Sequence, residues 1–434
     1  KIDHADNCPA ESVTSLGNGY MGARGNYEEY YTGTTLKGTY IAGVWVPDKT
    51  RVGWWKNGYP RYFGKVINAP DFLSFDLYLN GQRFDLAKAN LLSFYREVDM
   101  KTGLMSRKMD VQTPMGVLTI RSSRFFSCAQ KELACMHYCI ESHDFEGQVR
   151  LETGVSADVF NTDANYGERF WNVERVLAQD EMLQLTAKTH ENHFGIERFT
   201  VCFTSWTKGK GYEEMHLQTQ DNWTKQIFET KLVPGGSLDL EKYVSVTTSR
   251  DHAADRLEAV GETLLKAALN EGLDSLEKKH CQVWEDRWQM CDVVIEGDEA
   301  AQQGIRFNLF QLLSTYDGSD ARLNIGPKGF TGEKYGGAAY YDTEGYCFPL
   351  YLAVAGPDVA RSLLMFRYNT LDKAKENAAK LGLKGAFYPM VTFNGEECHN
   401  EWEITFEELH RNAAMVYAIY CYTKYTGDDS YLRT

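Results

Sequence analysis

One stretch of the sequence gathers acidic, hydrogen-bonding and aromatic side chains at high density. Residues 394–412 hold six carboxylates, two histidines, one arginine and one tryptophan within nineteen positions. Carboxylates accept hydrogen bonds from hydroxyl groups, and an aromatic ring packs on the apolar CH face of a sugar. This composition indicates a site for a neutral polyol. The alternative is a solvated acidic turn followed by the start of a helix.

A second candidate lies upstream, where two tyrosines precede two acids. Tyr340 and Tyr341 are followed by Asp342 and Glu344, and then by an apolar segment. One interpretation is structural: Asp342 or Thr343 caps a helix that starts here, with Glu344 in its first turn. The other is functional: the rings and a fixed carboxylate hold a sugar ring and its hydroxyl groups. The residues alone leave both open.

Other motifs give weaker signals. Residues 17–25 are glycine-rich but lack the Gly-Lys-Ser/Thr ending of a phosphate loop, so they indicate tight β-turns. His190 and His193 have no third ligand at a useful spacing, and we expect no metal site there. The sequence contains no recognisable dinucleotide-binding or zinc-finger spacing.

Composition narrows the class of protein and of partner. The chain has 434 residues and a net charge of −14, which argues against nucleic acid because phosphate contacts need clustered Lys and Arg. No apolar run approaches the roughly 18 residues of a membrane span, so we expect no membrane partner. None of the ten cysteines forms a Cys-x-x-Cys pair. Free thiols and a cytoplasmic location are the prediction.

The periodicity of apolar residues divides the chain into three parts. Residues 1–255 alternate apolar and polar side chains, as in 73–79, which ends at the hairpin signal Asn80-Gly81. This predicts a large antiparallel β-sandwich. Residues 256–298 change to helical spacing and predict a helical linker. Residues 299–434 predict further helices joined by glycine-containing loops, as in a helical toroid.

Within that last part we expect helices at 301–316, 344–355 and 402–426, and one long or two short helices within 357–381. The segment after Thr426 contains another helix start signal, so the helical domain is expected to be incomplete in this chain.

Four segments together resemble glycoside hydrolase family 65, the inverting disaccharide phosphorylases. They are 15–26, 326–337, 341–344 and 395–412, and the resemblance extends over nearly the whole chain. It implies a multi-domain β + α fold with an N-terminal antiparallel β-sandwich, a helical linker and an (α/α)6 barrel. Only the start of that barrel would lie in this chain.

The resemblance also implies roles for individual residues. The Trp-Asp pair that holds the glucosyl unit in the family falls on Tyr341 and Asp342, with Tyr in place of Trp. The family's acceptor loop falls on His399, Asn400, Glu401 and Trp402, and here it is similar to that of the maltose-specific members. The family's general acid is a Glu in a Gly-Pro-Asn-Glu-Tyr motif. No such motif occurs before Thr434, so the catalytic acid stays unassigned.

The reaction implied is inverting phosphorolysis of maltose to β-glucose 1-phosphate and glucose. Inorganic phosphate would be the co-substrate, with no other cofactor and no metal, and the family resemblance implies a homodimer. Two alternatives stay open. The substrate could be another α-glucosyl disaccharide, namely kojibiose, nigerose or trehalose. The chain by itself could also be a catalytically incomplete carbohydrate-binding fragment.

Overall fold

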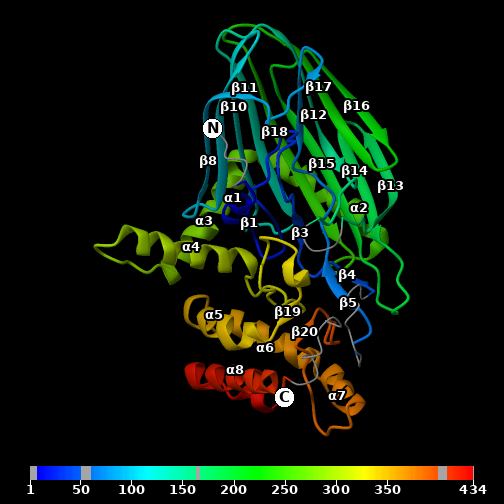
Figure 1. Ribbon diagram of the computed structural model, residues 1–434, viewed down its shortest axis with the longest axis vertical. Helices are drawn as coiled ribbons and strands as arrows, with labels where there is room; N and C mark the ends of the chain where they lie inside the picture. Colours follow the sequence, from blue (N-terminus) through cyan, green and yellow to red (C-terminus); the bar gives the residue numbers. More distant parts are fainter. Residues whose placement is uncertain (1–6, 50–59, 163–166, 399–407, 434) are drawn as a thin grey trace.

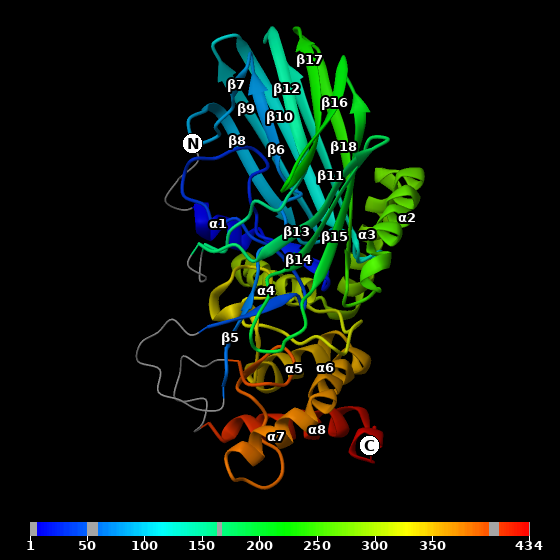
Figure 2. The same cartoon turned by 90° about the vertical axis from the view of Figure 1, so that its right-hand side faces the viewer.

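The computed structural model of the protein describes residues 7–49, 60–162, 167–398 and 408–433 (Figure 1). The first part of the chain forms a tall body of β-sheets, and a smaller stack of helices lies below it (Figures 1 and 2). The predicted class, an antiparallel sandwich followed by a helical region, is confirmed.

The β body contains two large sheets in which all neighbouring strands are antiparallel. The eight-stranded sheet has the order β13 (Trp171–Gln179), β14 (Met182–Thr189), β15 (Thr200–Lys210), β18 (Ser237–Thr248), β11 (Leu133–Ser142), β10 (Gly116–Phe126), β9 (Leu104–Thr113) and β8 (Asn90–Asp99). The five-stranded sheet has the order β16 (Glu214–Gln220), β17 (Trp223–Leu232), β12 (Gly147–Ser156), β6 (Phe75–Leu79) and β7 (Gln82–Arg83).

An apolar core lies between these sheets. Residues of β6 alternate between buried and half-buried, as expected for a strand with one face in the core. The rings of Phe75 on β6 and Tyr138 on β11 are stacked, with centroids 4.6 Å apart. The β6–β7 hairpin turns at Asn80 and Gly81, whose φ angles of 48° and 79° suit the turn type that Asn-Gly favours. The sequence prediction of this hairpin is therefore correct.

The N-terminal segment is fixed to the sandwich by buried charges. It contains α1 (Asn7–Val13) and a three-stranded sheet of β1 (Leu16–Gly17), β2 (Met21–Ala23) and β3 (Thr39–Ile41). Glu28 lies 2.6 Å from the Arg107 guanidinium and 2.8 Å from that of Arg124. Burial favours the neutral carboxyl, but the two guanidiniums outweigh it and hold the pKa of Glu28 below its usual value. An ionised pair network thus anchors this segment.

The linker consists of a 3₁₀ turn (Ala254–Arg256), α2 (Leu257–Glu271) and α3 (Leu273–Cys291). Both helices lie along the side of the β body (Figure 2). The Ser245 hydroxyl of β18 donates to the Gly261 carbonyl at 2.7 Å. A Cβ at Gly261 would meet Thr204 Oγ1 at 2.7 Å. The missing side chain therefore lets α2 approach the sheet closely.

The remaining helices form the lower part of the molecule. They are α4 (Glu299–Thr315), a π-helical turn (Thr343–Cys347) that continues into α5 (Phe348–Val354), α6 (Pro357–Asn369), α7 (Leu371–Lys380), α8 (His410–Thr426) and a 3₁₀ turn (Ser430–Arg433). A short 3₁₀ turn (Lys334–Gly337) lies in the loop between α4 and the π-helical turn. The predicted segment 357–381 is thus two helices.

The helix predicted to begin at Trp402 begins at His410, and residues 408 and 409 are not helical. Tertiary contacts fix this start. Arg411 pairs with Glu397 at 3.2 Å, and the Asn412 side chain accepts the Tyr388 N–H at 3.0 Å.

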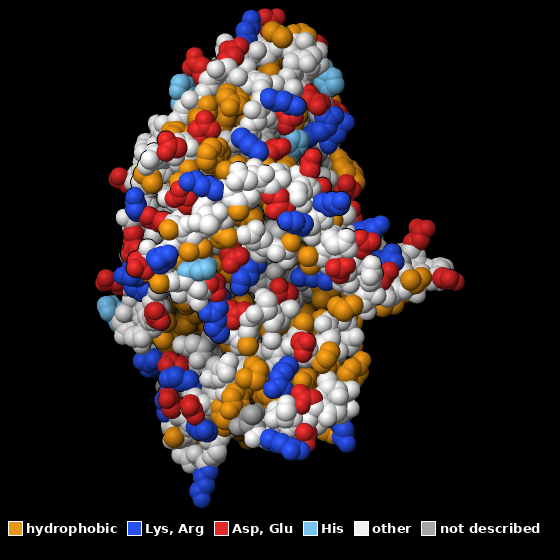
Figure 3. Space-filling view, turned by 180° about the vertical axis from the view of Figure 1, so that it is seen from behind, with side chains coloured by type: hydrophobic (Ala, Val, Ile, Leu, Met, Phe, Trp, Pro, Cys, Tyr) orange, Lys and Arg blue, Asp and Glu red, His pale blue; other side chains and the backbone are white. Residues whose placement is uncertain are grey.

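Several surface properties bear on partners. Within the described ranges, no helix is long and apolar enough to cross a bilayer. The face shown in Figure 3 intersperses acidic and basic side chains. All ten cysteines are free thiols.

The last strand of the large sheets ends at Thr248 and α4 begins at Glu299. The division into 1–255, 256–298 and 299–434 stays a prediction.

Candidate active site

Asp342 lines a cavity of about 530 Å³. Its walls come from the end of α1, one face of α4, the loop of residues 325–331 and residues 340–347. The volume lies within the roughly 300–1,000 Å³ of ligand sites. Polar side chains from α4 and the loop line it as well: Asn308, Gln311, Lys328 and Thr331. Two of the four segments that carry the family resemblance therefore meet at one cavity.

Glu344, two residues after Asp342, does not line this cavity. Its carboxylate is 1% exposed and is held by Arg367 of α6, with Nε–Oε1 and Nη2–Oε2 distances of 2.7 and 2.8 Å. The Asn324 amide donates to the same carboxylate at 3.2 Å. Since such a two-point contact fixes a carboxylate, Glu344 anchors the turn that carries Asp342.

The structural alternative, in which Asp342 or Thr343 caps the helix, is wrong. Asp342 precedes a π-helical turn and makes no side-chain capping bond. The Thr343 hydroxyl instead donates to the Ile325 carbonyl at 2.9 Å, which joins this turn to the loop opposite. Among the described residues the Asp342 carboxylate has no hydrogen-bond or ion-pair partner. Its acceptor oxygens are free for the hydroxyl groups of a ligand.

Tyr341 is placed differently from its neighbour. Its ring contacts His410 edge-on, with centroids 5.0 Å apart, and it is not among the residues that line the cavity. Tyr340 lines the cavity in its place. The structure therefore does not bring Tyr341 and Asp342 to the same cavity wall.

The predicted acceptor residues His399, Asn400, Glu401 and Trp402 lie outside the described residues. The chain on both sides of them is firmly held. Glu397 accepts the N–H groups of Met390 and Val391 at 2.6 and 3.1 Å. It also pairs with Arg411, and both side chains are fully buried. A buried ion pair thus joins the two flanks of residues 399–407.

A second acid of this stretch also has a structural role. Glu396 lies 3.0 Å from the guanidinium of Arg61 and 3.5 Å from the ammonium of Lys373. The guanidinium outweighs the effect of burial and holds the pKa of Glu396 below its usual value. Two of the six carboxylates that suggested sugar binding therefore stabilise the fold. Sequence composition could not separate them from the rest.

Aromatic residues of the β body support the same region. The hairpin of β4 (Trp45–Asp48) and β5 (Phe63–Val66) reaches down to a small sheet of β19 (Ala339–Tyr340) and β20 (Val391–Thr392). Trp45 stacks on Phe393 with centroids 4.7 Å apart and an interplanar angle of 6°. The Tyr62 hydroxyl donates to Glu396 at 3.3 Å. The N-terminal part of the chain thus packs directly against residues 393 and 396.

The glycine-rich motif has a role that the sequence did not reveal. Gly17 and Gly22 lie in strands β1 and β2, and a Cβ at either one would approach the Phe330 ring to 2.4 Å. Arg24 donates to the neighbouring Thr331 carbonyl. The two glycines form a socket for Phe330, so the N-terminal segment holds the loop that lines the cavity. The sequence could not reveal this role because Phe330 lies about 310 residues away from the two glycines.

The cavity offers a free carboxylate, amide and hydroxyl side chains and one ammonium. This set can bind a polyol through its hydroxyl groups. Among the described residues, one group of three side chains is close enough to ligate a metal, namely Glu214, His216 and Glu229. It lies on β16 and β17 of the sandwich surface and not at the cavity.

Comparison with known proteins agrees with this geometry. Residues 1–287 match the model for the N-terminal domain of glycosyl hydrolase family 65, and residues 306–434 match the model for its central catalytic domain. Maltose phosphorylase of Bacillus subtilis (strain 168) is 51% identical over 97% of this chain and 55% of its own length. Alpha,alpha-trehalose phosphorylase of Thermoanaerobacter brockii is 31% identical over the same shares.

The fold has a solved counterpart. A structure named "Putative kojibiose phosphorylase from human microbiome" superposes with a TM-score of 0.91 at 28% identity, over 100% of this chain and 56% of that one. The chain thus spans a little more than half the length of these relatives. Both family models and the 51% identical relative lead to one conclusion: the chain belongs to glycosyl hydrolase family 65.

Proposed function

We propose that the whole protein is an inverting disaccharide phosphorylase with maltose as its substrate. The observation that carries the proposal is the 51% identity to the Bacillus subtilis maltose phosphorylase over 97% of the chain. The reaction converts maltose and inorganic phosphate into β-glucose 1-phosphate and glucose. Phosphate is the co-substrate, and the proposal includes no other cofactor.

Inverting phosphorolysis needs one carboxylic acid. The acid protonates the glycosidic oxygen while phosphate attacks C1 from the opposite face of the sugar. Phosphate is already an anion, so it replaces both the water and the general base of an inverting hydrolase. In this scheme Asp342 accepts hydrogen bonds from the hydroxyl groups of the donor glucosyl unit. Its place in the cavity and its lack of a described partner support that role.

The acceptor glucose would be oriented by His399, Asn400, Glu401 and Trp402. The held flanks support this assignment, because a loop anchored at both ends costs less entropy to order around a ligand. The anchors are the buried Glu397–Arg411 pair and the stack of Trp45 on Phe393.

A second candidate keeps the chemistry and changes the disaccharide to kojibiose, nigerose or trehalose. The observation that favours it is Tyr341, which stands where the family resemblance expects a tryptophan. A tyrosine ring that lies against His410 and outside the cavity at Asp342 does not supply the packing area that a tryptophan would give the donor sugar.

The test is an assay of the complete gene product with maltose, with and without inorganic phosphate. We expect glucose release that depends on phosphate and a β-configured glucose 1-phosphate by proton NMR. Release of glucose without phosphate would remove the phosphorylase proposal. Turnover of kojibiose, nigerose or trehalose in preference to maltose would select the second candidate.

We further propose a homodimer in the cytoplasm, as the resemblance and the free thiols suggest. Light scattering coupled to size exclusion would measure the mass, and a monomer would contradict the first part.

A further inference from the structure

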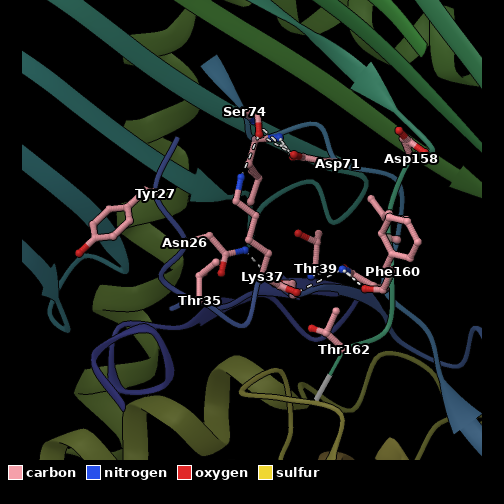
Figure 4. A pocket seen from close by; sticks show the side chains of 15 residues that line it. Asn26, Tyr27, Thr35, Lys37, Thr39, Asp71, Ser74, Asp158, Phe160 and Thr162 are labelled. Atoms are coloured by element: carbon pink, nitrogen blue, oxygen red, sulfur yellow. Dashed lines mark hydrogen bonds between the residues drawn. The ribbon is translucent and has the colours of Figure 1, made fainter. Parts of the chain in front are cut away.

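A second cavity lies within the β body (Figure 4). It shares no lining residue with the cavity at Asp342. Three segments far apart in sequence form its walls, within 26–39, 68–74 and 158–162. Its volume of about 320 Å³ lies at the lower end of the roughly 300–1,000 Å³ of ligand sites. That size suits one sugar ring better than two.

The walls of this cavity are held by internal hydrogen bonds. The buried Asn68 amide donates to the carbonyls of Lys37 and Phe160, both at 3.2 Å. Its carbonyl oxygen accepts the Thr39 N–H at 2.8 Å. Asn68 thus ties its own wall segment to the other two, so hydrogen bonds within the protein hold the three walls together.

Lys37 has unused hydrogen-bonding capacity. Its stem crosses the cavity and its ammonium points toward Ser74 (Figure 4). The bond to the Ser74 hydroxyl is long, 3.5 Å, whereas an ammonium has three donors. The nearby Asp71 carboxylate accepts the Leu73 N–H at 2.9 Å and the Ser74 hydroxyl. Asp71 is therefore satisfied by its own turn, and Lys37 keeps donors available.

Asn26 supplies the complementary acceptor. Its amide nitrogen donates to the Gly38 carbonyl at 3.3 Å, while its Oδ1 is buried and has no partner among the residues that the structure describes. The side chain is 5% exposed, and it faces Thr35 and the Lys37 stem (Figure 4). A buried acceptor without a donor lowers the stability of the folded protein. A hydroxyl group bound in this cavity would remove that cost.

The rim adds an apolar surface. The Phe160 ring is 42% exposed, and the Arg169 guanidinium lies 4.3 Å from its centroid. Arg169 also pairs with Asp158, so these two charges cancel. Lys37 in turn lies near the ionised Asp71. The cavity therefore carries no net positive charge to favour an anion.

We propose that this cavity is an accessory binding site for a single neutral hexose. The free donors of Lys37, the unpartnered Oδ1 of Asn26 and the Phe160 ring match the hydroxyl groups and the CH face of a sugar. Glucose is the hexose to test, a choice that rests on the proposed function of the protein.

The test is hydrogen–deuterium exchange by mass spectrometry on the complete gene product titrated with glucose. Peptides from 68–74 report the accessory site, and peptides from 325–331 report the proposed active site. We expect glucose to slow exchange in 68–74. Lys37→Met and Phe160→Ala should each weaken that protection roughly tenfold or more, as expected for a lost charge-assisted bond or ring contact. Neither variant should change the protection that glucose gives to peptides from 325–331.

Two matched variants control for loss of a surface side chain, namely Lys208→Met on β15 and Tyr95→Ala on β8; neither should alter protection in 68–74. Absence of protection there, or an equal effect of Lys208→Met, would overturn the accessory site. Protection by inorganic phosphate alone would also overturn it in favour of an anion. If glucose slows exchange in 68–74 but not in 325–331, the result would count against the proposed function and would leave the accessory site standing.

Discussion

At the scale of single residues, Asp342 and Glu344 show how two like acids differ in role. Glu344 is buried against Arg367 and satisfied by it, whereas Asp342 reaches the cavity without a described partner. The family resemblance assigns Asp342 to the donor sugar, but the residue types alone do not show which of the two acids is free. That depends on Arg367, which lies on another helix and carries no local signal.

Asp342→Asn should lower kcat/KM for the proposed maltose phosphorolysis by about 100-fold, because it removes the charge that would strengthen the proposed hydrogen bonds to the donor sugar. Steady-state kinetics on the complete gene product would measure this. Asp358→Asn, at an exposed position in the first turn of α6, is the matched control and should leave kcat/KM unchanged. An unaltered rate in the Asp342 variant would show that this carboxylate does not bind substrate.

Glu344→Gln should destabilise the protein by about 3–5 kcal/mol, because it leaves the Arg367 guanidinium buried without its counter-charge. Urea unfolding would measure the loss. The comparison variant is Glu376→Gln, which breaks an exposed pair with Lys373 and should cost about 1 kcal/mol at most. Equal losses in the two variants would mean that Glu344 is not an anchor.

At the scale of elements, periodicity predicts the strands and most helices well, but it cannot predict their supports. The hairpin at Asn80 and Gly81 follows from two adjacent residues. The socket of Gly17 and Gly22 depends on Phe330, and the start of α8 depends on Arg411 meeting Glu397. The first contact spans about 310 residues and the second spans 14, and helical or strand periodicity encodes neither.

Gly22→Ala should displace the loop that carries Phe330. The added Cβ would lie 2.4 Å from that ring and 2.6 Å from the Leu16 carbonyl oxygen. Because that oxygen belongs to the backbone of β1, it cannot move aside without distorting the strand. We expect a loss of about 1–3 kcal/mol from overpacking, together with a higher KM for maltose. Urea unfolding and steady-state kinetics would measure the two effects.

The control for the socket is Gly304→Ala in α4, where a Cβ meets nothing within 4 Å. That change should stabilise the helix by about 0.5–1 kcal/mol. A Gly22→Ala protein with normal stability and normal KM would disprove the socket.

At the scale of the whole molecule, α3 connects the sandwich to the cavity. Trp288 donates to the Met100 carbonyl in the β8–β9 turn at 2.8 Å. Trp284 stacks on Phe310 of α4 with centroids 4.7 Å apart. Since α4 forms a wall of the cavity, the position of that wall depends on how α3 sits against the sandwich. The division into β and helical parts is visible in the sequence, but this connection is not.

The contact of α3 with the sandwich should weaken in acid through His280. Its Nδ1 accepts the Cys128 N–H at 3.1 Å, which requires the neutral ring. Burial lowers the pKa of His280 from 6.5 to about 4. The unfolded chain binds a proton below about pH 6.5, while the folded protein does so only near pH 4. The stability that His280 contributes is thus complete above pH 6.5 and is lost as the pH falls toward 4, by about 3 kcal/mol.

Urea midpoints at pH 7 and pH 4.5 should differ less in His280→Gln, which keeps a neutral acceptor, than in the wild type. His216→Gln, at an exposed histidine of β16, should behave as the wild type. An equal acid loss in the His280 variant would place the pH sensitivity elsewhere.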